Sequence, residues 1–292
     1  GGTESDNLAI KGIAYANKAK GNHIITSKIE HHAVFETCKE LEKEGFKVTY
    51  LDVDEEGFID INQLRKSISK NTILVSIMHA NNEIGTIEPV EEIGKICRAN
   101  NVYFHTDAVQ SLMKVPIDVK KMNIDLASFS AHKIHGPKGV GALFIRRGVN
   151  IKKQNIGGYQ EFDKRSGTEN IPGIVGFAKA VEIMKKEDLN RMESLRKKLI
   201  NGVLKTIPHT TLNGPKEKRL CNNASISFNF IEGESLLMRL DDRGIAVSTG
   251  SACSSRSLEP SHVLMAIGLK HEVAHGTLRL TLSKYTTDDE ID

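Results

Sequence analysis

The sequence has few cysteines, and they are far apart. Cys38, Cys97, Cys221 and Cys253 are the only four in 292 residues, and no two of them form a Cys-x-x-Cys pair. This spacing argues against a disulfide framework and against a zinc site built from protein ligands alone. It favours a reducing compartment, so we expect the protein in the cytoplasm, or in the mitochondrial matrix if the source is eukaryotic.

Long apolar runs and a strong charge bias are also missing. No stretch approaches the roughly 20 apolar residues that a membrane-spanning helix needs. The formal net charge is only +3, and no basic stripe interleaved with aromatic residues points to nucleic acid. With 39% hydrophobic and 26% charged residues, the composition is ordinary for a globular enzyme of one large or two smaller domains.

Strand-like and helix-like segments alternate along the first two thirds of the chain. The segment 72–78 is almost wholly apolar, as a strand in a sheet covered on both faces must be. This rhythm predicts an α/β fold with a mostly parallel sheet, helices on both faces, and ligands at the carboxyl ends of the strands. The expected strands are 23–27, 47–53, 72–78, 102–108, 125–131 and 141–147, and the expected helices are 32–45, 60–69 and 90–101.

The pattern changes near residue 187. A long charged helical stretch at 188–207 leads into a strand, a helix and a strand within 224–253, and a last strand lies in 275–285. We therefore expect a large domain over 1–187 and a smaller α+β domain over 188–292. The opening "GGTESDN" enters a helix with no strand before it, so we expect the large domain to be incomplete at its N-terminus.

Two of the predicted strands end in groups that could carry chemistry. Asp107 ends one strand, with Gln110 just beyond it, and Ser130, His132 and Lys133 end the next. A strand-end lysine often only reaches solvent, and a strand-end aspartate often caps a helix. Five polar groups delivered to one sheet edge nevertheless indicate a site.

A lysine, an acid and a helix start that suits phosphate together favour pyridoxal phosphate. The cofactor needs a lysine for its Schiff base, an acidic partner for its ring nitrogen and a cradle for its phosphate. "GGTESDN" offers backbone N–H groups at a helix start, although a capping box reads the same way.

Three further candidates are weaker. His31, in "EHHAV", follows the strand at 23–27, but one of two adjacent histidines is more often a surface residue. Asn82, in "NNEIG", follows the strand at 72–78, where Asn pairs usually form turns. Cys253 lies in the small, polar stretch "STGSACSS", and is either a chance surface cysteine or a nucleophile that moves to the cofactor.

Taken together, these stretches resemble the cysteine desulfurases, which belong to the class V aminotransferase group of fold-type I pyridoxal phosphate enzymes. The cysteine stretch resembles the long-loop group that serves iron–sulfur cluster assembly. The matching stretches run in order along essentially the whole chain, and include "GGTESDN", "EHHAV", "NNEIG", "HTDAVQS", "SFSAHKIHGPKGVGAL", "RSGTEN", "STGSACSS" and "LRLTLSKY".

The resemblance implies a role for each cofactor-binding residue. Lys133 would hold the cofactor as a Schiff base and later move the substrate α-proton, and Asp107 would pair with the pyridinium nitrogen. Gln110 would bond the phenolic oxygen, and His31 would stack on the ring and assist proton transfers. The phosphate would be held by Gly2, Thr3, Ser130 and His132, with Thr168 reaching in from a partner subunit.

The resemblance also implies the substrate and the partners. Asn82 and Arg279 would bind the carboxylate of L-cysteine, and Cys253 would attack its sulfur as a thiolate, forming a persulfide and leaving L-alanine. The implied partners are a second copy of the chain, an iron–sulfur scaffold protein and other sulfur acceptors, with no nucleic acid and no membrane. No resident metal is expected, although the Cys253 persulfide could share an iron–sulfur cluster with the scaffold.

The chain departs from the family pattern in places, and two other readings stay open. Tyr159 stands where a third glycine is usual, and Val109 where Thr or Ala is common. Another class V pyridoxal enzyme, such as a small-amino-acid aminotransferase, would explain Lys133 and Asp107 but not the stretch around Cys253. A sulfur-relay or scaffold protein that has lost catalysis is the non-enzyme alternative, and the lack of cofactor absorbance would reveal it.

Overall fold

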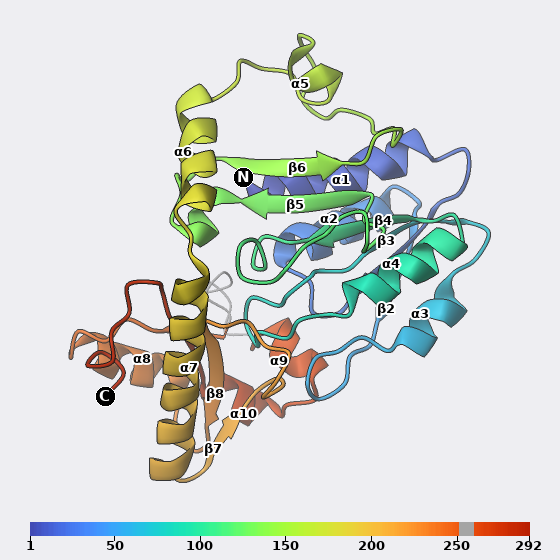
Figure 1. Cartoon of the computed structure of the whole chain (residues 1–292). Coiled ribbons are helices and arrows are strands. Elements are labelled where there is room, and N and C mark those ends of the chain that lie inside the picture. The colour runs from blue at the N-terminus through green and yellow to red at the C-terminus, as the bar shows by residue number, and fades with distance from the viewer. Residues whose placement is uncertain (251–259) are drawn as a thin grey trace. The chain divides into compact units, whose positions relative to one another are not determined.

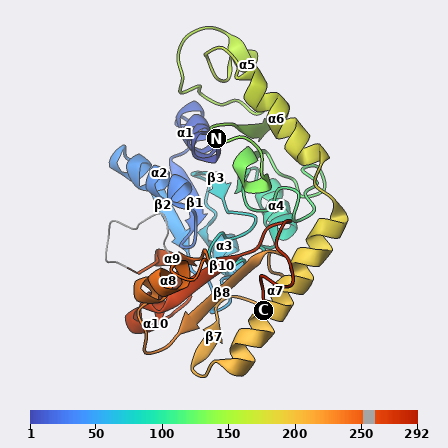
Figure 2. The same cartoon turned by 90° about the vertical axis from the view of Figure 1, so that its left-hand side faces the viewer.

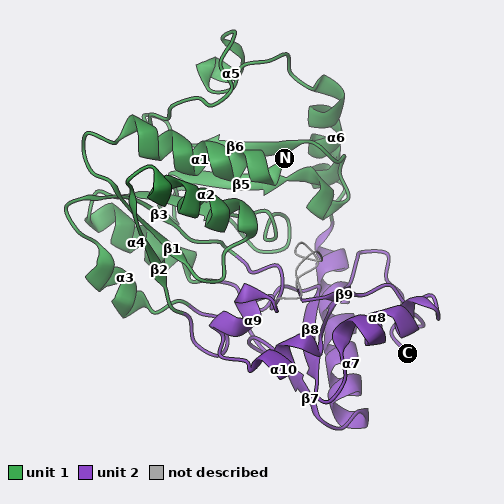
Figure 3. Ribbon diagram, turned by 180° about the vertical axis from the view of Figure 1, so that it is seen from behind, with its two compact units in different colours: residues 1–52, 59–79, 88–184 green, residues 53–58, 80–87, 185–292 purple. Residues whose placement is uncertain are grey.

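The computed structural model describes residues 1–250 and 260–292 and divides them into two compact units (Figure 3). Unit 1 comprises 1–52, 59–79 and 88–184, and unit 2 comprises 53–58, 80–87 and 185–292. The sequence suggested one division, at 187, whereas the chain passes from unit 1 to unit 2 at 184/185 and also sends two short earlier segments into unit 2.

Unit 1 is built on a six-stranded sheet in the order β2-β1-β3-β4-β5-β6 (Figure 1). All neighbouring strands are parallel except β5 and β6, which pair antiparallel. The predicted, mostly parallel sheet is therefore confirmed. The strands are β1 (His23–Ser27), β2 (Lys47–Leu51), β3 (Thr72–Ser76), β4 (Tyr103–Asp107), β5 (Leu126–Ser130) and β6 (Gly141–Ile145).

Helices cover both faces of this sheet. Helices α1 (Gly2–Ala16) and α2 (His32–Lys43) lie on one face, and α3 (Ile61–Ser67) and α4 (Val90–Ala99) lie on the other (Figures 1 and 3). The apolar side of α1 packs on the sheet, because its isoleucines are fully buried in the same cluster as residues of β1, β3 and β5. That cluster includes Ile10, Ile13, Ile24, Leu74 and Leu126.

The rest of unit 1 follows the sheet. A short 3-10 helix, η1 (Ala131–Ile134), comes directly after β5 and ends at His135, whose φ of 63° is left-handed. Beyond β6 come α5 (Gln160–Asp163) and α6 (Ile171–Glu182). Asn170 is the N-cap of α6, and its side chain accepts a hydrogen bond from the Gly173 N–H.

Unit 2 is an α+β unit, as the sequence predicts. Its antiparallel sheet has the order β7-β8-β10-β9, and helix α7 (Lys186–Thr206) runs beside it (Figure 2). No helix among residues 1–250 and 260–292 is both long and apolar enough to cross a bilayer. The remaining elements are β7 (Thr210–Leu212), β8 (Asn223–Phe228), α8 (Gly233–Asp241), β9 (Ser248–Thr249), α9 (His262–Ala266), α10 (His271–His275) and β10 (Thr277–Thr281).

Candidate active site

The first turn of α1 lies against the ends of β4 and β5, and a glycine permits this approach. A Cβ atom built on Gly2 would come within 2.8 Å of Val109 Cγ2 and 3.5 Å of Ser130 Cβ. No side chain of the described residues caps this helix, so none of them takes its first backbone N–H groups as a cap. Such a helix start fits an anionic group, as a phosphate is.

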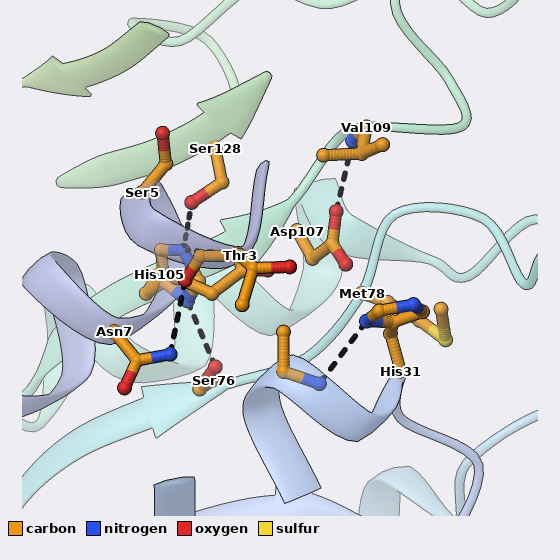
Figure 4. A network of polar contacts seen from close by, with 12 residues as sticks. Thr3, Ser5, Asn7, His31, Ser76, Met78, His105, Asp107, Val109 and Ser128 are labelled. Atoms are coloured by element: carbon orange, nitrogen blue, oxygen red, sulfur yellow. Dashed lines mark hydrogen bonds and ion pairs between the residues drawn. The ribbon is translucent and has the colours of Figure 1, made fainter. Parts of the chain in front are cut away.

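Asp107 is buried at the end of β4, with 5% of its surface exposed. Its Oδ1 accepts a 2.9 Å hydrogen bond from the Val109 N–H (Figure 4). Burial raises the pKa of the carboxyl group to about 6, while the backbone hydrogen bond and the positive charge of Lys133 act in the opposite direction. A cation placed beside this carboxylate would offset the cost of its burial.

The turn after β5 brings three predicted residues to the same edge of the sheet. Ser130 Oγ lies 2.8 Å from His132 Nδ1, and Lys133 follows in the exposed part of η1. The charge of Lys133 acts on the carboxyl group of Asp107, which places the two predicted strand-end groups near each other. Partial burial, together with the charge of Lys133, lowers the pKa of His132 and favours its neutral form.

His31 is the residue that caps α2. Its Nδ1 accepts a 3.1 Å hydrogen bond from the Ala33 N–H, so a neutral His31 ring carries its proton on Nε2. His31 and Thr3 line a common cavity of about 370 Å³, together with residues of α1 and α2 that include Asn7 and Lys11. The structure thus brings His31 and the α1 start to one cavity.

Asn82 and Arg279 lie together in unit 2. Arg279 Nη1 is 3.4 Å from the backbone oxygen of Asn82, and its Nη2 is 3.4 Å from Ser248 Oγ. The side-chain amide of Asn82 is not the group that Arg279 contacts. Both side chains are half-buried.

Two described site residues, Gln110 and Thr168, make none of these contacts. Gln110 is half-buried in the turn after Asp107. Thr168 is exposed, in a segment that meets α1 through the 2.8 Å ion pair between Arg165 and Glu4. Cys253 lies outside the described residues.

Sequence reasoning missed a buried polar cluster beneath the site. The His105 ring lies between Ser76 Oγ, at 2.8 Å from Nδ1, and Ser128 Oγ, at 3.0 Å from Nε2 (Figure 4). Asp6 of α1 reaches the same ring. The signal that could have revealed it is the spacing of His105 and Asp107, which lie two residues apart and therefore on one face of a buried strand.

Comparison with known proteins covers the whole chain. Residues 1–292 match the family described as Aminotransferase class-V. The chain is 60% identical to "Cysteine desulfurase IscS" of Clostridium botulinum, covering 100% of this chain and 75% of that protein. It is 59% identical to the protein of the same name in Methanosarcina thermophila, covering 100% of this chain and 73% of that protein.

Solved structures give the same result. A structure described as "NIFS-LIKE PROTEIN" superposes with a TM-score of 0.92 at 44% identity, covering 100% of this chain and 78% of that one. Another, "SspA in complex with cysteine", superposes with a TM-score of 0.85 at 38% identity, covering 98% of this chain and 81% of that one. The sequence, the fold and these relatives agree, and the chain belongs to the class V aminotransferase family, in its cysteine desulfurase branch.

Proposed function

We propose that this protein is a pyridoxal-phosphate-dependent cysteine desulfurase. It converts L-cysteine to L-alanine and takes the sulfur atom onto the Cys253 thiol, which becomes a persulfide. The observation that carries the cofactor assignment is the meeting of Asp107, Lys133 and the start of α1 at one edge of the sheet.

The residues at this edge fit the cofactor group by group. Asp107 is a buried anion for the ring nitrogen, and Lys133 supplies the amine for the covalent attachment. The first turn of α1, with Ser130 and His132 beside it, suits the phosphate. When bound, pyridoxal phosphate supplies an electron sink for negative charge at the α-carbon of an amino acid.

Proton movement falls to Lys133 and His31. The lysine is exposed at the site edge, so its amine can take a proton from the substrate α-carbon and return one to the product. The neutral His31 ring presents an Nε2–H donor, because its Nδ1 is occupied by the helix cap. In this neutral form His31 is suited to donate a hydrogen bond from Nε2 rather than to act as a base through Nδ1.

Substrate binding falls to Arg279 and Asn82 of unit 2. A guanidinium group binds a carboxylate with two parallel hydrogen bonds, which distinguishes an amino acid from a simple amine. The contacts of Arg279 with Asn82 and Ser248 hold the guanidinium in one orientation. The relatives named cysteine desulfurase, and the related structure described in complex with cysteine, support L-cysteine as the substrate.

The active form is a homodimer in which Thr168 reaches the phosphate of the partner's site. Support comes from the segment around Thr168, which exposes more large apolar side chains than a free surface favours. Phe162 is 94% exposed and Tyr159 is 84% exposed. The other exposed apolar side chains there are Ile156, Ile171, Ile174 and Val175.

The persulfide sulfur would pass to an iron–sulfur scaffold protein or to another acceptor. The resemblance of the cysteine stretch to the long-loop cysteine desulfurases supports this assignment. The test is direct: the protein is loaded with pyridoxal phosphate and given L-cysteine and a reductant. Equal amounts of alanine and sulfide are the expected products, whereas pyruvate or a transaminated product would contradict the proposal.

A further inference from the structure

Val109 contacts both halves of the candidate cofactor site. Its backbone N–H donates a 2.9 Å hydrogen bond to Asp107 Oδ1, in the half that suits the ring nitrogen (Figure 4). Its side chain lies against the start of α1, in the half that suits the phosphate. A Cβ atom built on Gly2 would come within 2.8 Å of Val109 Cγ2 and 3.8 Å of Val109 Cγ1. One residue therefore joins the acid of the site to its helix start.

The chain on either side of Val109 is held in place by backbone hydrogen bonds. The Ala108 N–H donates to the Ser128 carbonyl oxygen at 3.0 Å, and the Ala108 carbonyl oxygen accepts the Leu112 N–H at 3.0 Å. The side chain is stiff as well, because two heavy atoms on the Cβ of a valine restrict rotation about χ1. Val109 is therefore a fixed wall, and a group pressed against it must itself move.

The space above Gly2 is limited mainly by the methyl groups of Val109. A Cβ contact of 2.8 Å is shorter than real Cβ atoms make, whereas the Cβ of Ser130 would lie at an ordinary 3.5 Å. Alanine is a better helix former than glycine, so the first residue of α1 has no intrinsic need to be glycine. Removing the Val109 methyl groups should therefore make room for an alanine at position 2.

We propose that Val109 is a positioning residue for the cofactor: its N–H holds Asp107 while its methyl groups hold the start of α1, so that one rigid residue sets the spacing between the two. This inference rests on the proposed function, in which Asp107 pairs with the ring nitrogen and α1 binds the phosphate. These two groups are a fixed distance apart in pyridoxal phosphate. A site that binds both must keep its acid and its helix start at the matching distance.

The first test is a double-mutant cycle measured by the Kd for pyridoxal phosphate. Gly2→Ala in the parent chain should raise the Kd at least about tenfold, because the new methyl group pushes the helix start away from Val109. In a Val109→Ala background the same Gly2→Ala change should raise the Kd less than about threefold, because the space is then free. Equal effects of Gly2→Ala in the two backgrounds would overturn the proposal.

The second test separates the two ends of the cofactor. Val109→Ala keeps the N–H that Asp107 accepts and loses only the contact with α1. Its Kd for pyridoxal phosphate should rise about fivefold, and its Kd for pyridoxal, which has no phosphate, less than about twofold. Val109→Thr keeps the branched shape and should bind both compounds as the parent does. A Val109→Ala variant that loses affinity for both compounds equally, or for neither, would overturn the proposal.

The control and the parent chain complete the design. Val115→Ala removes the same two methyl groups from another half-buried valine of this connection and should leave both Kd values unchanged. Circular dichroism and urea unfolding of the cofactor-free variants check that each one folds. A parent chain that binds no pyridoxal phosphate would overturn the proposed function, and the role of Val109 with it. Additive effects in the cycle, with a parent that binds the cofactor, would overturn the role of Val109 alone.

Discussion

Ser261 donates a 2.5 Å hydrogen bond to Glu83 Oε2, joining residues that are 178 positions apart in the sequence. Both residues belong to unit 2 and both are buried. Ser261 is also the N-cap of α9, where its Oγ accepts the N–H groups of Val263 and Leu264. Gly250 lies against the same carboxylate, since a Cβ built on it would come 3.8 Å from Glu83 Oε2. One carboxyl group thus contacts the chain on both sides of the segment that carries Cys253.

Ser261→Ala should destabilise the protein more than the loss of a helix cap alone. Losing an N-cap costs about 1 kcal/mol, and leaving the buried Glu83 oxygen without its donor adds about 1–3 kcal/mol. Asp60→Ala is the control, because Asp60 caps the exposed end of α3 through a 2.8 Å bond to the Asn62 N–H. Urea unfolding would measure both variants, and equal losses would show that the Glu83 contact contributes nothing.

Lys133 should be the single point of covalent cofactor attachment. Borohydride reduction of the pyridoxal-phosphate-loaded protein should fix the cofactor on the peptide that contains Lys133, as peptide mass spectrometry would show. Lys133→Ala should give no fixed adduct, while Lys138→Ala, five residues further along the same turn, should react as the parent does. An adduct mapped to another lysine would refute the assignment.

Cys253 should be the only cysteine that receives sulfur. Burial raises the pKa of the Cys97 thiol to about 12 and that of Cys38 even further, so neither forms the reactive thiolate near neutral pH. Cys253→Ala should keep the cofactor and bind L-cysteine, yet lose sulfide release by at least about 100-fold. Alanine variants of Cys38, Cys97 and Cys221 should release sulfide normally if they fold.

Mass spectrometry can identify directly the cysteine that receives the sulfur. After incubation with labelled L-cysteine, non-reducing mass spectrometry should find one extra sulfur on the peptide that contains Cys253. A label on any other cysteine would contradict the proposed route.

Lys133→Ala and Thr168→Ala should complement each other when mixed. If each site combines Lys133 of one subunit with Thr168 of the other, a hybrid dimer contains one intact site. Random exchange makes half of the dimers hybrid, so the mixture should regain roughly a quarter of the parental activity. Each variant mixed with itself is the control, and a mixture that stays as inactive as its components would argue against shared sites.

Glu30 should make the folded state less stable as the pH rises. Burial raises its pKa in the folded state to about 8, from a value of 4.5. Between these two values the folded state therefore binds more protons than the unfolded state, so the free energy of unfolding falls with increasing pH. The contribution is at most about 1.4 kcal/mol per pH unit.

Glu30→Gln should flatten this dependence, because glutamine does not titrate. Urea unfolding at several values between pH 5 and about pH 8 would compare the slopes of the two proteins. Asp118→Asn, which removes an exposed carboxylate, should leave the parental slope in this range. An identical slope in the parent and in Glu30→Gln would show that Glu30 does not bind an extra proton in the folded state over this pH range.

The strands of unit 1 could be predicted to within about two residues because each is a short apolar run between turn residues. The antiparallel direction of β6 was not predicted, although the link from Ser130 to Gly141 is too short for a parallel crossover. The membership of 80–87 in unit 2 could not be predicted, because it depends on pairing with residues more than 130 positions away, as in the bridge between Thr86 and Arg219.

The candidate site, like the fold, could be predicted from the sequence only in part. Asp107 and Lys133 could be proposed as site residues because strand ends are visible in the sequence. Asp6 was missed because a single polar residue in the first turns of a helix looks like a solvent-facing one. The partner-subunit role of Thr168 and the persulfide on Cys253 came from the resemblance. The polar stretch around Cys253 indicated only a candidate nucleophile.

The segments 53–58 and 80–87 have a consequence for synthesis on the ribosome. They emerge early, but the rest of unit 2 begins only at residue 185. Ile84 is fully buried in the folded protein, but it lacks most of its unit 2 neighbours while about 100 residues are added. This takes about 5–20 seconds at typical elongation rates. Unit 1 can form its sheet during this interval, whereas unit 2 closes only after release of the last strand. The nascent chain therefore exposes the Ile84 side chain during this interval, where a chaperone could bind it.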